Sequence, residues 1–480
     1  MKPYKILVFI LLTFSALALL GMVFPKNGVN IGLCTLTFPT PGAIISDNKV
    51  EEMDIESNLE ALNEQATMSH SATATDSLAF YRNYVRNNAA RIYFPNNDYT
   101  YFDKLFAILE SAHKSDKAVH IVHYGDSQIE MDRISSMFRH RIQEQFGGKG
   151  AGMVPPIQTI PSFTVRQNYA GNLSRYVVYG DTSQPRASHR RYGILANMAQ
   201  LSGEASITVG ASTGSRTFSE TQKFSRIVLL IGNNADHFSA VCGGQQRSIA
   251  VANRGVSRLT WTLPQAVSQT TIHLNGTAEI YAVSMEDPSG VNIDNVPMRG
   301  CSGTIFTRMD SLIFAQCNAN MNVQLIIMQY GGNMMPQINS QKAIDNYMER
   351  IAKQIQYIHH CNPKAKILFI GPSDMSKRID GVMQTYTYLP AMNEALKATV
   401  LKNDAAYWDM YNVMGGKNSM VSWVKHSPAW AGGDYVHFTE AGALKIATTL
   451  SDAFLLHYHF YVMRKRFPDI LMERLMKSNQ

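Results

Sequence analysis

The sequence predicts an α/β protein with a parallel sheet, interrupted by an inserted all-β domain. An apolar, β-branched run at 118–124 ends at Gly125, as a strand does when it delivers a functional turn to the carboxyl edge of a sheet. After Val296, apolar runs of strand length alternate with segments of helical periodicity, which is typical of a parallel sheet covered by helices on both faces. Between 156 and 295, short runs of alternating polar and apolar residues are separated by Gly, Ser, Asn and Thr, which indicates a β-sandwich or jelly roll.

The α/β part is expected in two segments, 96–155 and 296–465, on either side of the inserted domain. In the first segment, apolar residues at helical spacing begin near Tyr101, and a further helix is expected from about Met131 to Gln145. In the second segment we expect helix 308–320, strand 323–329, helix 341–360, strand 365–370, helix 388–401, a short strand near Tyr407 and a last helix at about 439–463. Residues 466–480 form a basic tail.

The amino-terminal segment, 1–25, predicts export. Lys2 and Lys5 precede an uncharged apolar stretch from Ile6 to Phe24, which is long enough to span a bilayer with the rest of the chain on the outer side. An uncleaved membrane anchor is favoured over a cleaved signal peptide because no clear A-x-A cleavage site follows. Residues 26–95 are polar and rich in acidic and small residues, so a tether with room for one short helix is expected there.

Composition removes several function classes. The formal net charge of +7 is not gathered into basic blocks with interleaved aromatic residues, so nucleic-acid binding is not expected. The sequence has no metal-ligand constellation and no phosphate-binding glycine loop, so neither a metal nor a cofactor is expected. Buried free thiols are expected, with a Cys301–Cys317 bridge as the alternative, because no zinc or disulfide pattern joins the five cysteines, Cys34, Cys242, Cys301, Cys317 and Cys361.

Three residues form a candidate catalytic set. Ser127 follows the predicted strand in a Gly-Asp-Ser turn, which makes it a candidate nucleophile. A serine hydroxyl needs a base within hydrogen-bond reach and a carboxylate that holds this base in the right tautomer. Asp434 and His437 are three residues apart, a spacing that brings both side chains to one side of a turn. His437 is therefore predicted to accept the serine proton, and Asp434 to orient the imidazole.

Four motifs occur in a fixed order along the chain, and together they resemble a known family. They are Gly125-Asp126-Ser127, M-R-G-C-S-G around Gly300, Y-G-G-N ending at Asn333, and D-Y-V-H-F-T-E-A-G from Asp434. This order resembles the SGNH branch of the GDSL esterase/lipase family, and the last block, with A-Y-W-D and M-G-G before it, resembles the peptidoglycan O-acetylesterases. The resemblance covers the chain from about residue 101 to 457, with an interruption in the middle.

The resemblance implies both a fold and an oxyanion hole. It implies a flavodoxin-like three-layer sandwich, and the insertion is similar to the carbohydrate-binding-module-like insertions of the peptidoglycan O-acetylesterases. It also implies that the backbone N–H groups of Ser127 and Gly300 and the side-chain amide of Asn333 bind the oxyanion. Many family members have Asp after this asparagine, whereas this chain has Met334. Separately, Trp423 and Trp430 lie in the loop before Asp434 and are candidates for stacking on sugar faces.

The expected function is that of a serine esterase that removes O-acetyl groups from a cell-envelope polysaccharide, with peptidoglycan as the leading substrate. The expected location is the periplasmic side of the bacterial cell envelope, either anchored to the inner membrane or secreted. One alternative is an O-acetyltransferase that uses the same triad to pass acetyl to a glycan. Another, of a different class, is an inactive carbohydrate-binding protein, against which the intact set of five site residues argues.

Overall fold

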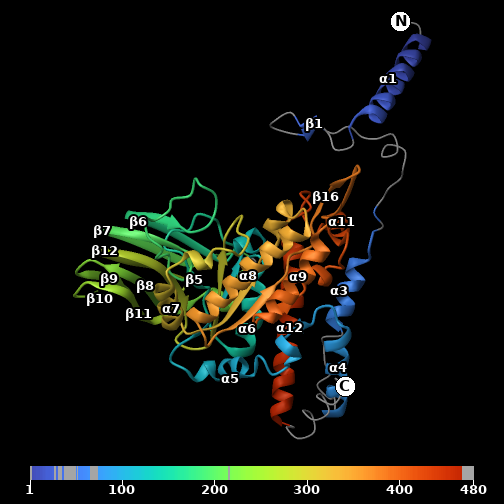
Figure 1. Cartoon of the computed structure of the whole chain (residues 1–480). Helices are drawn as coiled ribbons and strands as arrows, with labels where there is room; N and C mark the ends of the chain where they lie inside the picture. The colour runs from blue at the N-terminus through green and yellow to red at the C-terminus, as the bar shows by residue number, and fades with distance from the viewer. Residues whose placement is uncertain are drawn as a thin grey trace.

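The structure is a computed structural model and describes residues 3–25, 29–30, 35–36, 50, 52–64, 74–214 and 217–466. The folded body has an antiparallel sheet at one end and a layered α/β part at the other (Figure 1). The residues of the predicted catalytic set all come from the α/β part.

A six-stranded sheet forms the centre of the α/β part, in the order β13-β4-β14-β15-β18-β3. The first five strands are parallel, and β3 pairs with β18 in the antiparallel direction. When the five parallel strands are numbered along the chain, their order in the sheet is 2-1-3-4-5, which is the flavodoxin-like order. The predicted parallel sheet is therefore confirmed. The strand bounds are Ile92–Tyr93 (β3), Val119–Gly125 (β4), Val291–Pro297 (β13), Val323–Gln329 (β14), Lys366–Ile370 (β15) and Ala406–Trp408 (β18).

Helices cover both faces of this sheet and make three layers. Residues of β4 alternate between two apolar cores, with Val122 in one core and Ile121 in the other. Because both faces are covered, β4 is buried along its whole length, which is why it reads as an apolar run. One face carries α7 (Ser311–Asn320), α8 (Gln341–Cys361) and α9 (Leu389–Lys402), and the other carries α5 (Asp103–Ser111), α6 (Ser135–Phe146) and α12 (Glu440–Arg466).

The helix that was expected to begin near Met131 begins later. Ser127–Asp132 forms a short 3-10 helix, η3, and α6 starts only at Ser135. Met131 and Asp132 have φ of +61° and +66°, which no right-handed helix accommodates, so the chain kinks between the two helices. The other short elements of this part are η1 (Pro95–Asn97), η2 (Ala112–Lys114), η5 (Phe306–Arg308), η6 (Gly332–Gln337), β16 (Ser376–Ile379), β17 (Val382–Thr385), α10 (Met410–Val413) and α11 (Ser419–Lys425).

The interrupting segment forms an eight-stranded antiparallel sheet, in which the long strand β12 pairs with β5, β7, β8 and β9. The segment consists mainly of β-strands, as its sequence indicated, and a jelly-roll arrangement stays a prediction. The element bounds are Gly152–Val154 (β5), Val165–Val177 (β6), Asn197–Ala211 (β7), Ser219–Thr221 (η4), Phe224–Asn234 (β8), Phe238–Cys242 (β9), Gln245–Ile249 (β10), Asn253–Val267 (β11) and Gln269–Glu286 (β12).

The ends of this segment differ from the expected 156–295. Strand β5 already pairs with β12, whereas β13 belongs to the parallel sheet and pairs with β4. Strand β13 reads as part of an antiparallel sheet because Asn292 and Asp294 alternate with apolar residues. Both polar side chains are fully buried, and Asp294 is hydrogen-bonded to His120 and to the backbone N–H of Met153. The period-two pattern therefore reflects buried polar groups here, of which Asp294 is paired, and not a solvent-exposed face.

The expected tether, 26–95, is wrong over much of its length. Helix α3 (Ile55–Glu64) buries Ile55 and Leu59 in a core of the α/β part, and α4 (Ala74–Asn87) contributes Tyr81, whose hydroxyl lies 2.6 Å from Nδ1 of His457 on α12. Figure 1 shows both helices running along this part of the molecule. The few apolar residues of this region recur at helical spacing, so they suffice for docking although the segment as a whole is polar.

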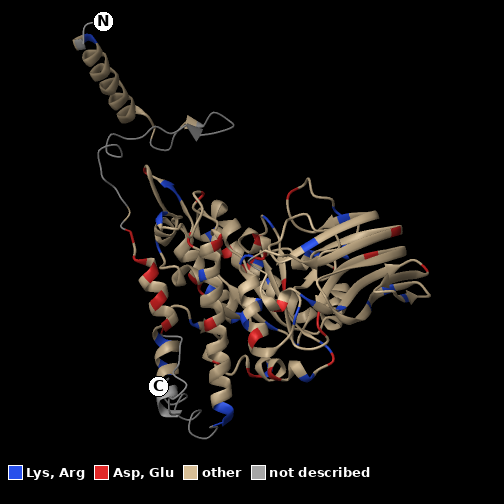
Figure 2. Ribbon diagram, turned by 180° about the vertical axis from the view of Figure 1, so that it is seen from behind, with Lys and Arg blue, Asp and Glu red and all other residues tan. Residues whose placement is uncertain are grey.

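The amino-terminal helix α1 (Pro3–Val23) is apolar throughout and long enough to cross a membrane, and it fits either a signal peptide or an anchor. It precedes two short paired strands, Val29–Asn30 (β1) and Thr35–Leu36 (β2). Figure 2 shows basic and acidic residues mixed over the body. Helix α12 ends in Arg464, Lys465 and Arg466. Cys242, Cys301, Cys317 and Cys361 are buried and free, so the Cys301–Cys317 bridge is absent. Cys34 and residues 467–480 lie outside the described residues.

Candidate active site

Ser127, His437 and Asp434 come together at the carboxyl edge of the parallel sheet. Ser127 is the second residue after β4 and the first of η3, and its Oγ lies 2.8 Å from Nε2 of His437. Nδ1 of His437 lies 2.7 Å from Oδ2 of Asp434. An ionised carboxylate only accepts hydrogen bonds, so Nδ1 carries the imidazole proton and Nε2 is left to accept from the serine hydroxyl. The geometry is that of a nucleophile, a base and an orienting carboxylate.

The carboxylate of Asp434 is held in its ionised form. Its Oδ1 accepts hydrogen bonds from the backbone N–H groups of Val436 and His437, each at 3.0 Å. Partial burial raises the pKa of Asp434, but the hydrogen bonds from the His437 side chain and from these two N–H groups outweigh burial and keep the pKa below its usual value. Asp434 is thus charged at neutral pH and stabilises a protonated His437.

Asp126 braces the nucleophile turn. Its Oδ1 accepts a hydrogen bond from the backbone N–H of Gln128 at 2.9 Å, which caps η3, and its Oδ2 accepts one from the side-chain amide of Asn333 at 3.0 Å. Burial raises the pKa of Asp126 to about 6 in spite of these hydrogen bonds. Gly125 before it leaves no room for a side chain, since a Cβ there would lie 2.9 Å from the side chain of Ile129. The turn that presents Ser127 is therefore held from both sides.

The two remaining oxyanion candidates lie at the same cleft. Gly300 has a φ of +73°, a conformation that favours glycine, and a Cβ at this position would meet no atom within 4 Å. The amide of Asn333 donates to Asp126 and, at 3.1 Å, to the carbonyl of Cys301. To donate to a substrate oxyanion, Asn333 would exchange one of these two bonds, and Asp126 would keep the amide oriented. Met334, the residue that departs from the family pattern, is buried in the core.

A cleft of about 660 Å³ opens at this edge of the sheet, where β4 and β14 lie side by side. These two strands flank the point at which the strand order reverses, the usual ligand-binding position of such sheets. The lining residues are Asp126, Ser127, Gln128, Glu130, Arg133, Arg299, Gly300, Gln329, Tyr330, Gly332, Asn333, Pro336, Gly371, Pro372, Ser373, Met375, Tyr386, Met410, Val436 and His437. The cleft thus contains the predicted nucleophile, base and oxyanion residues together.

Gln128 is a site residue that the sequence reading missed. Its side-chain amide donates to the carbonyl of Val436 at 2.7 Å and to Oγ of Ser373 at 3.2 Å. The side-chain oxygen Oε1 of Gln128 accepts a hydrogen bond from the backbone N–H of Phe438 at 3.2 Å. Gln128 therefore joins the nucleophile turn to the loop that carries His437. The available signal was a polar residue directly after the nucleophile, and Ser373 is shown to be a partner of Gln128.

Two arginines stand at the cleft. Arg299 is 69% exposed and forms two hydrogen bonds to the buried carboxylate of Glu130, at 2.8 and 2.6 Å. Arg133 donates to the carbonyls of Glu130 and Phe438 at 3.0 and 3.2 Å. The acidic partner is buried and the guanidinium of Arg299 faces solvent, so this side of the cleft presents positive charge to a ligand.

Trp423 and Trp430 do not reach the cleft, so their predicted role in substrate stacking is wrong. They are 0% and 2% exposed, their ring centroids lie 5.3 Å apart, and both belong to an apolar core. Nε1 of Trp423 donates to the carbonyl of Met414 at 3.1 Å. Phe438, which follows His437, packs on Trp423 with ring centroids 5.3 Å apart. The two tryptophans thus support the base loop from beneath.

The two histidines of β4, His120 and His123, are buried and bonded inside the protein. His120 contacts Asp294 and Glu286 at 2.8 and 3.1 Å. Burial opposes its charge, but these two carboxylates outweigh burial and raise the pKa of His120 to about 10. His123 lies between Gln329 and Ser135, and burial lowers its pKa to about 4. One histidine is therefore charged and the other neutral at pH 7.

A group of side chains outside the cleft offers metal-ligating atoms. Among the described residues, His140, Glu144 and Glu220 place a nitrogen and carboxylate oxygens within 4.8 Å of one another. Both ring nitrogens of His140 face carboxylates, at 2.9 and 3.6 Å. His140 and Glu144 lie on α6 and Glu220 lies in η4, and none of the three lines the cleft at Ser127.

Comparison with known proteins identifies the fold. No protein-family model and no curated protein sequence match the chain. A solved structure of a peptidoglycan O-acetylesterase superposes with a TM-score of 0.61; it is 21% identical, and the match covers 75% of this chain and 96% of that one. The resemblance to SGNH-type esterases is therefore confirmed at the level of the fold.

Two more distant structures are family 2 carbohydrate esterases. One, from Corynascus thermopiles (Myceliophthora fergusii) and with a carbohydrate-binding domain, is 11% identical, with a TM-score of 0.28 and coverage of 60% of this chain and 100% of that one. The other, from Clostridium thermocellum in complex with cellohexaose, is 10% identical, with a TM-score of 0.24 and the same coverage. At such TM-scores these two structures carry no argument about this chain.

Proposed function

We propose that the protein is a serine esterase that removes O-acetyl groups from a cell-envelope polysaccharide, with peptidoglycan as the leading substrate. The observation that carries this proposal is the array in which Ser127 Oγ lies 2.8 Å from His437 Nε2 and His437 Nδ1 lies 2.7 Å from Asp434. Gly300 and Asn333 border the same cleft. Such an array performs acyl transfer through a covalent intermediate.

In the proposed mechanism, His437 takes the proton of Ser127 while Oγ attacks the carbonyl carbon of the acetyl ester. The negative charge that forms on the carbonyl oxygen is bound by the N–H groups of Ser127 and Gly300 and by the amide of Asn333. The intermediate then collapses, the carbon–oxygen bond to the sugar breaks, and His437 returns its proton to the sugar oxygen. Water, deprotonated by His437, attacks the acetyl-Ser127 ester and releases acetate.

Three observations support an envelope glycan as the substrate. The fold is shared with a peptidoglycan O-acetylesterase. The cleft of about 660 Å³ is open to solvent and large enough for a sugar unit of a polymer. Arg299 and Arg133 present positive charge to ligands that carry carboxylates, as envelope glycans do. The apolar helix α1 supports export and membrane attachment, with the folded body on the periplasmic side.

Product analysis with O-acetylated peptidoglycan tests the proposal. The purified protein is incubated with this polymer in the presence and absence of an unacetylated acceptor glycan. Free acetate that appears at the same rate in both reactions supports the esterase. Acetyl groups found on the acceptor would instead support the alternative function, that of an O-acetyltransferase. If no acetylated glycan lost acetyl groups, the result would favour the alternative of an inactive carbohydrate-binding protein.

A further inference from the structure

We propose that the antiparallel sheet acts in catalysis by holding the nucleophile turn in its working conformation, with Thr164 as the positioning residue. The inference rests on Ser127 being the nucleophile of the proposed esterase. It assigns to the inserted segment a role in positioning the reacting hydroxyl, in addition to any contact with a polymer.

The segment that begins with Ser127 is strained and needs support. Here the nucleophile turn means η3, Ser127–Asp132, whose last two residues, Met131 and Asp132, have φ of +61° and +66°. Two successive side-chain-bearing residues in this left-handed region cost free energy, so the conformation persists only where the surroundings hold it. Relaxation at Met131 and Asp132 would move the backbone that leads back to Ser127.

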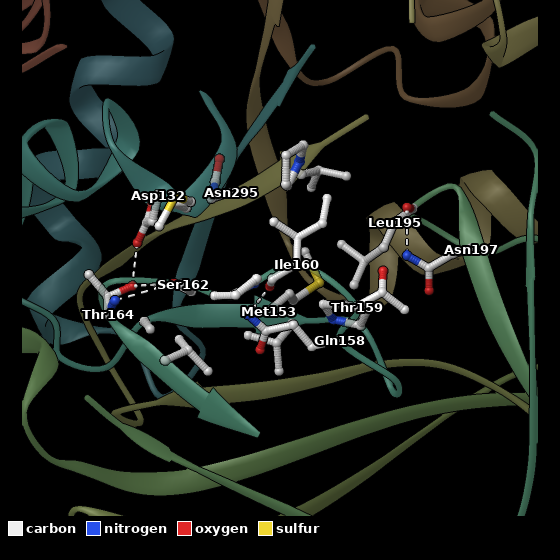
Figure 3. A pocket seen from close by; sticks show the side chains of 18 of the residues that line it. Asp132, Met153, Gln158, Thr159, Ile160, Ser162, Thr164, Leu195, Asn197 and Asn295 are labelled. Atoms are coloured by element: carbon white, nitrogen blue, oxygen red, sulfur yellow. Dashed lines mark hydrogen bonds between the residues drawn. The ribbon is translucent and has the colours of Figure 1, made fainter. Parts of the chain in front are cut away.

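The residues just before β6 supply that support. The backbone N–H of Phe163 donates to the carbonyl of Met131 at 3.0 Å. The hydroxyl of Thr164 donates to Oδ2 of Asp132, and Figure 3 shows these two groups facing each other beside a cavity of about 70 Å³. Both strained residues of the turn are therefore bonded to consecutive residues of the inserted segment.

Both partners of this contact are buried. Thr164 is 0% exposed and Asp132 is 2% exposed. The buried carboxylate of Asp132 is also paired with the buried guanidinium of Arg139, at 2.7 and 3.2 Å. Arg139 in turn donates from Nε to the carbonyl of Ile293 on β13 at 2.8 Å. Because both residues are buried, loss of the Thr164 hydroxyl would remove one of the hydrogen-bond donors to the carboxylate of Asp132.

The support is anchored in the antiparallel sheet. The carbonyl of Thr164 accepts a hydrogen bond from the N–H of Ser212, just after β7, at 2.9 Å. The carbonyl of Phe163 accepts one from the hydroxyl of Thr217 at 3.2 Å. The position of Thr164 is thus fixed by the fold of the inserted segment, and that position is passed to Asp132.

The test compares three variants of the full-length protein with 4-nitrophenyl acetate as substrate. We expect Thr164→Val to lower kcat by roughly 10- to 100-fold with little change in KM, since small displacements of a reacting group have effects of this size. The rate at which a fluorophosphonate labels Ser127 should fall in parallel. Thr164→Ser keeps the hydroxyl and should retain activity close to that of the wild type.

Thr208→Val is the matched control, because the hydroxyl of this β7 threonine also forms a hydrogen bond inside the protein, at 2.8 Å to the hydroxyl of Thr271. It should leave kcat unchanged. Should Thr164→Val not fold, Thr164→Cys, with its weak S–H donor, replaces it and should lower kcat. A folded Thr164→Val or Thr164→Cys protein with the kcat of Thr208→Val overturns the inference, as does a Thr164→Ser protein as impaired as Thr164→Val. If the wild-type protein neither cleaved the ester nor were labelled at Ser127, the proposed esterase function itself would be refuted.

Discussion

Gln128 donates a hydrogen bond from its side-chain amide to the backbone carbonyl of Val436 at 2.7 Å, and so connects the residue after the proposed nucleophile to the residue before the proposed base. Its side-chain oxygen accepts from the N–H of Phe438, on the other side of His437. The distance between Ser127 and His437 is therefore set by one buried glutamine, and does not depend only on the two loops that carry them.

Replacement of Gln128 should test this connection. We expect Gln128→Ala to lower kcat by about 10- to 100-fold, because the two halves of the site would no longer share a fixed geometry. Gln128→Glu still accepts from Phe438 but cannot donate to Val436, so it should recover little activity. Steady-state kinetics on a small acetyl ester measures both effects. Full activity in Gln128→Glu would mean that the bond to Val436 is dispensable.

Ser127→Ala should abolish ester cleavage, because it removes the hydroxyl that lies 2.8 Å from His437 Nε2. The variant should also lose labelling by a fluorophosphonate, detected by mass spectrometry. A thermal melt that matches the wild type would show that the fold is intact. Undiminished labelling in this variant would overturn the assignment of the nucleophile.

Asn333→Ala should lower kcat by about 10² to 10³ with little change in KM, the usual loss for one oxyanion donor. Met334→Leu is a suitable control, since this neighbour is buried in the core and the exchange conserves volume. It should leave kcat within a few-fold of the wild type. If Asn333→Ala raised KM alone, the residue would belong to substrate binding.

Arg299→Gln should weaken the processing of acidic glycans selectively. We expect KM for an O-acetylated glycan that carries carboxylates to rise by up to about fivefold, because exposed ion pairs contribute about 0–1 kcal/mol. Activity on acetylated xylan without acidic substituents should not change. Arg166→Gln, on β6 and outside the cleft lining, serves as the control. Equal effects on both glycans would show that Arg299 does not recognise the charge of the substrate.

The two buried histidines of β4 should give the stability opposite pH dependences. The pKa of His120 is raised from 6.5 to about 10, so its contribution is fully present below pH 6.5 and is lost as the pH rises toward 10. The pKa of His123 is lowered from 6.5 to about 4, so its contribution is present above pH 6.5 and is lost as the pH falls toward 4. Each amounts to the order of a few kcal/mol.

Melting temperatures measured between pH 4 and pH 10 test this contrast. His120→Gln should flatten the loss of Tm on the alkaline side and keep the acid slope. His123→Gln should flatten the acid slope and keep the alkaline one. An unchanged alkaline slope in His120→Gln would show that the charge of His120 does not contribute to folding.

The parallel sheet was predictable because its signals are local. Each of its main strands is buried on both faces and therefore appears as an apolar run, and β14 has the predicted bounds of 323–329. The positions of Ser127 and Asn333, which come soon after β4 and β14, follow because carboxyl ends of parallel strands meet at one edge. His437 lies in the loop between α11 and α12, so this argument does not place it. No local pattern distinguishes β13 from the strands of the antiparallel sheet, since its Asp294 is paired with a residue far away in the sequence, His120.

The misplaced residues have one cause in common, which is that burial depends on distant segments. Trp423 and Trp430 lie close to the catalytic loop in the sequence, yet their side chains point into the core beneath it. Helices α3 and α4 have a polar composition, but a narrow apolar stripe on each meets α12 or its neighbours. The roles of Gln128 and Thr164 depend on partners more than thirty residues away, Val436 and Asp132, which the sequence does not pair.

The pairing of β13 with β4 has a consequence for the order in which the chain folds. Val119 lies opposite Val291, so the edge strand of the parallel sheet is made only after the whole antiparallel sheet has been synthesised. If that sheet folds first, β5 and β12 bring its two ends together and shorten the loop that must close before β13 can add to β4. A nascent chain released before residue 291 would expose an unpaired edge of β4 and would be prone to aggregate.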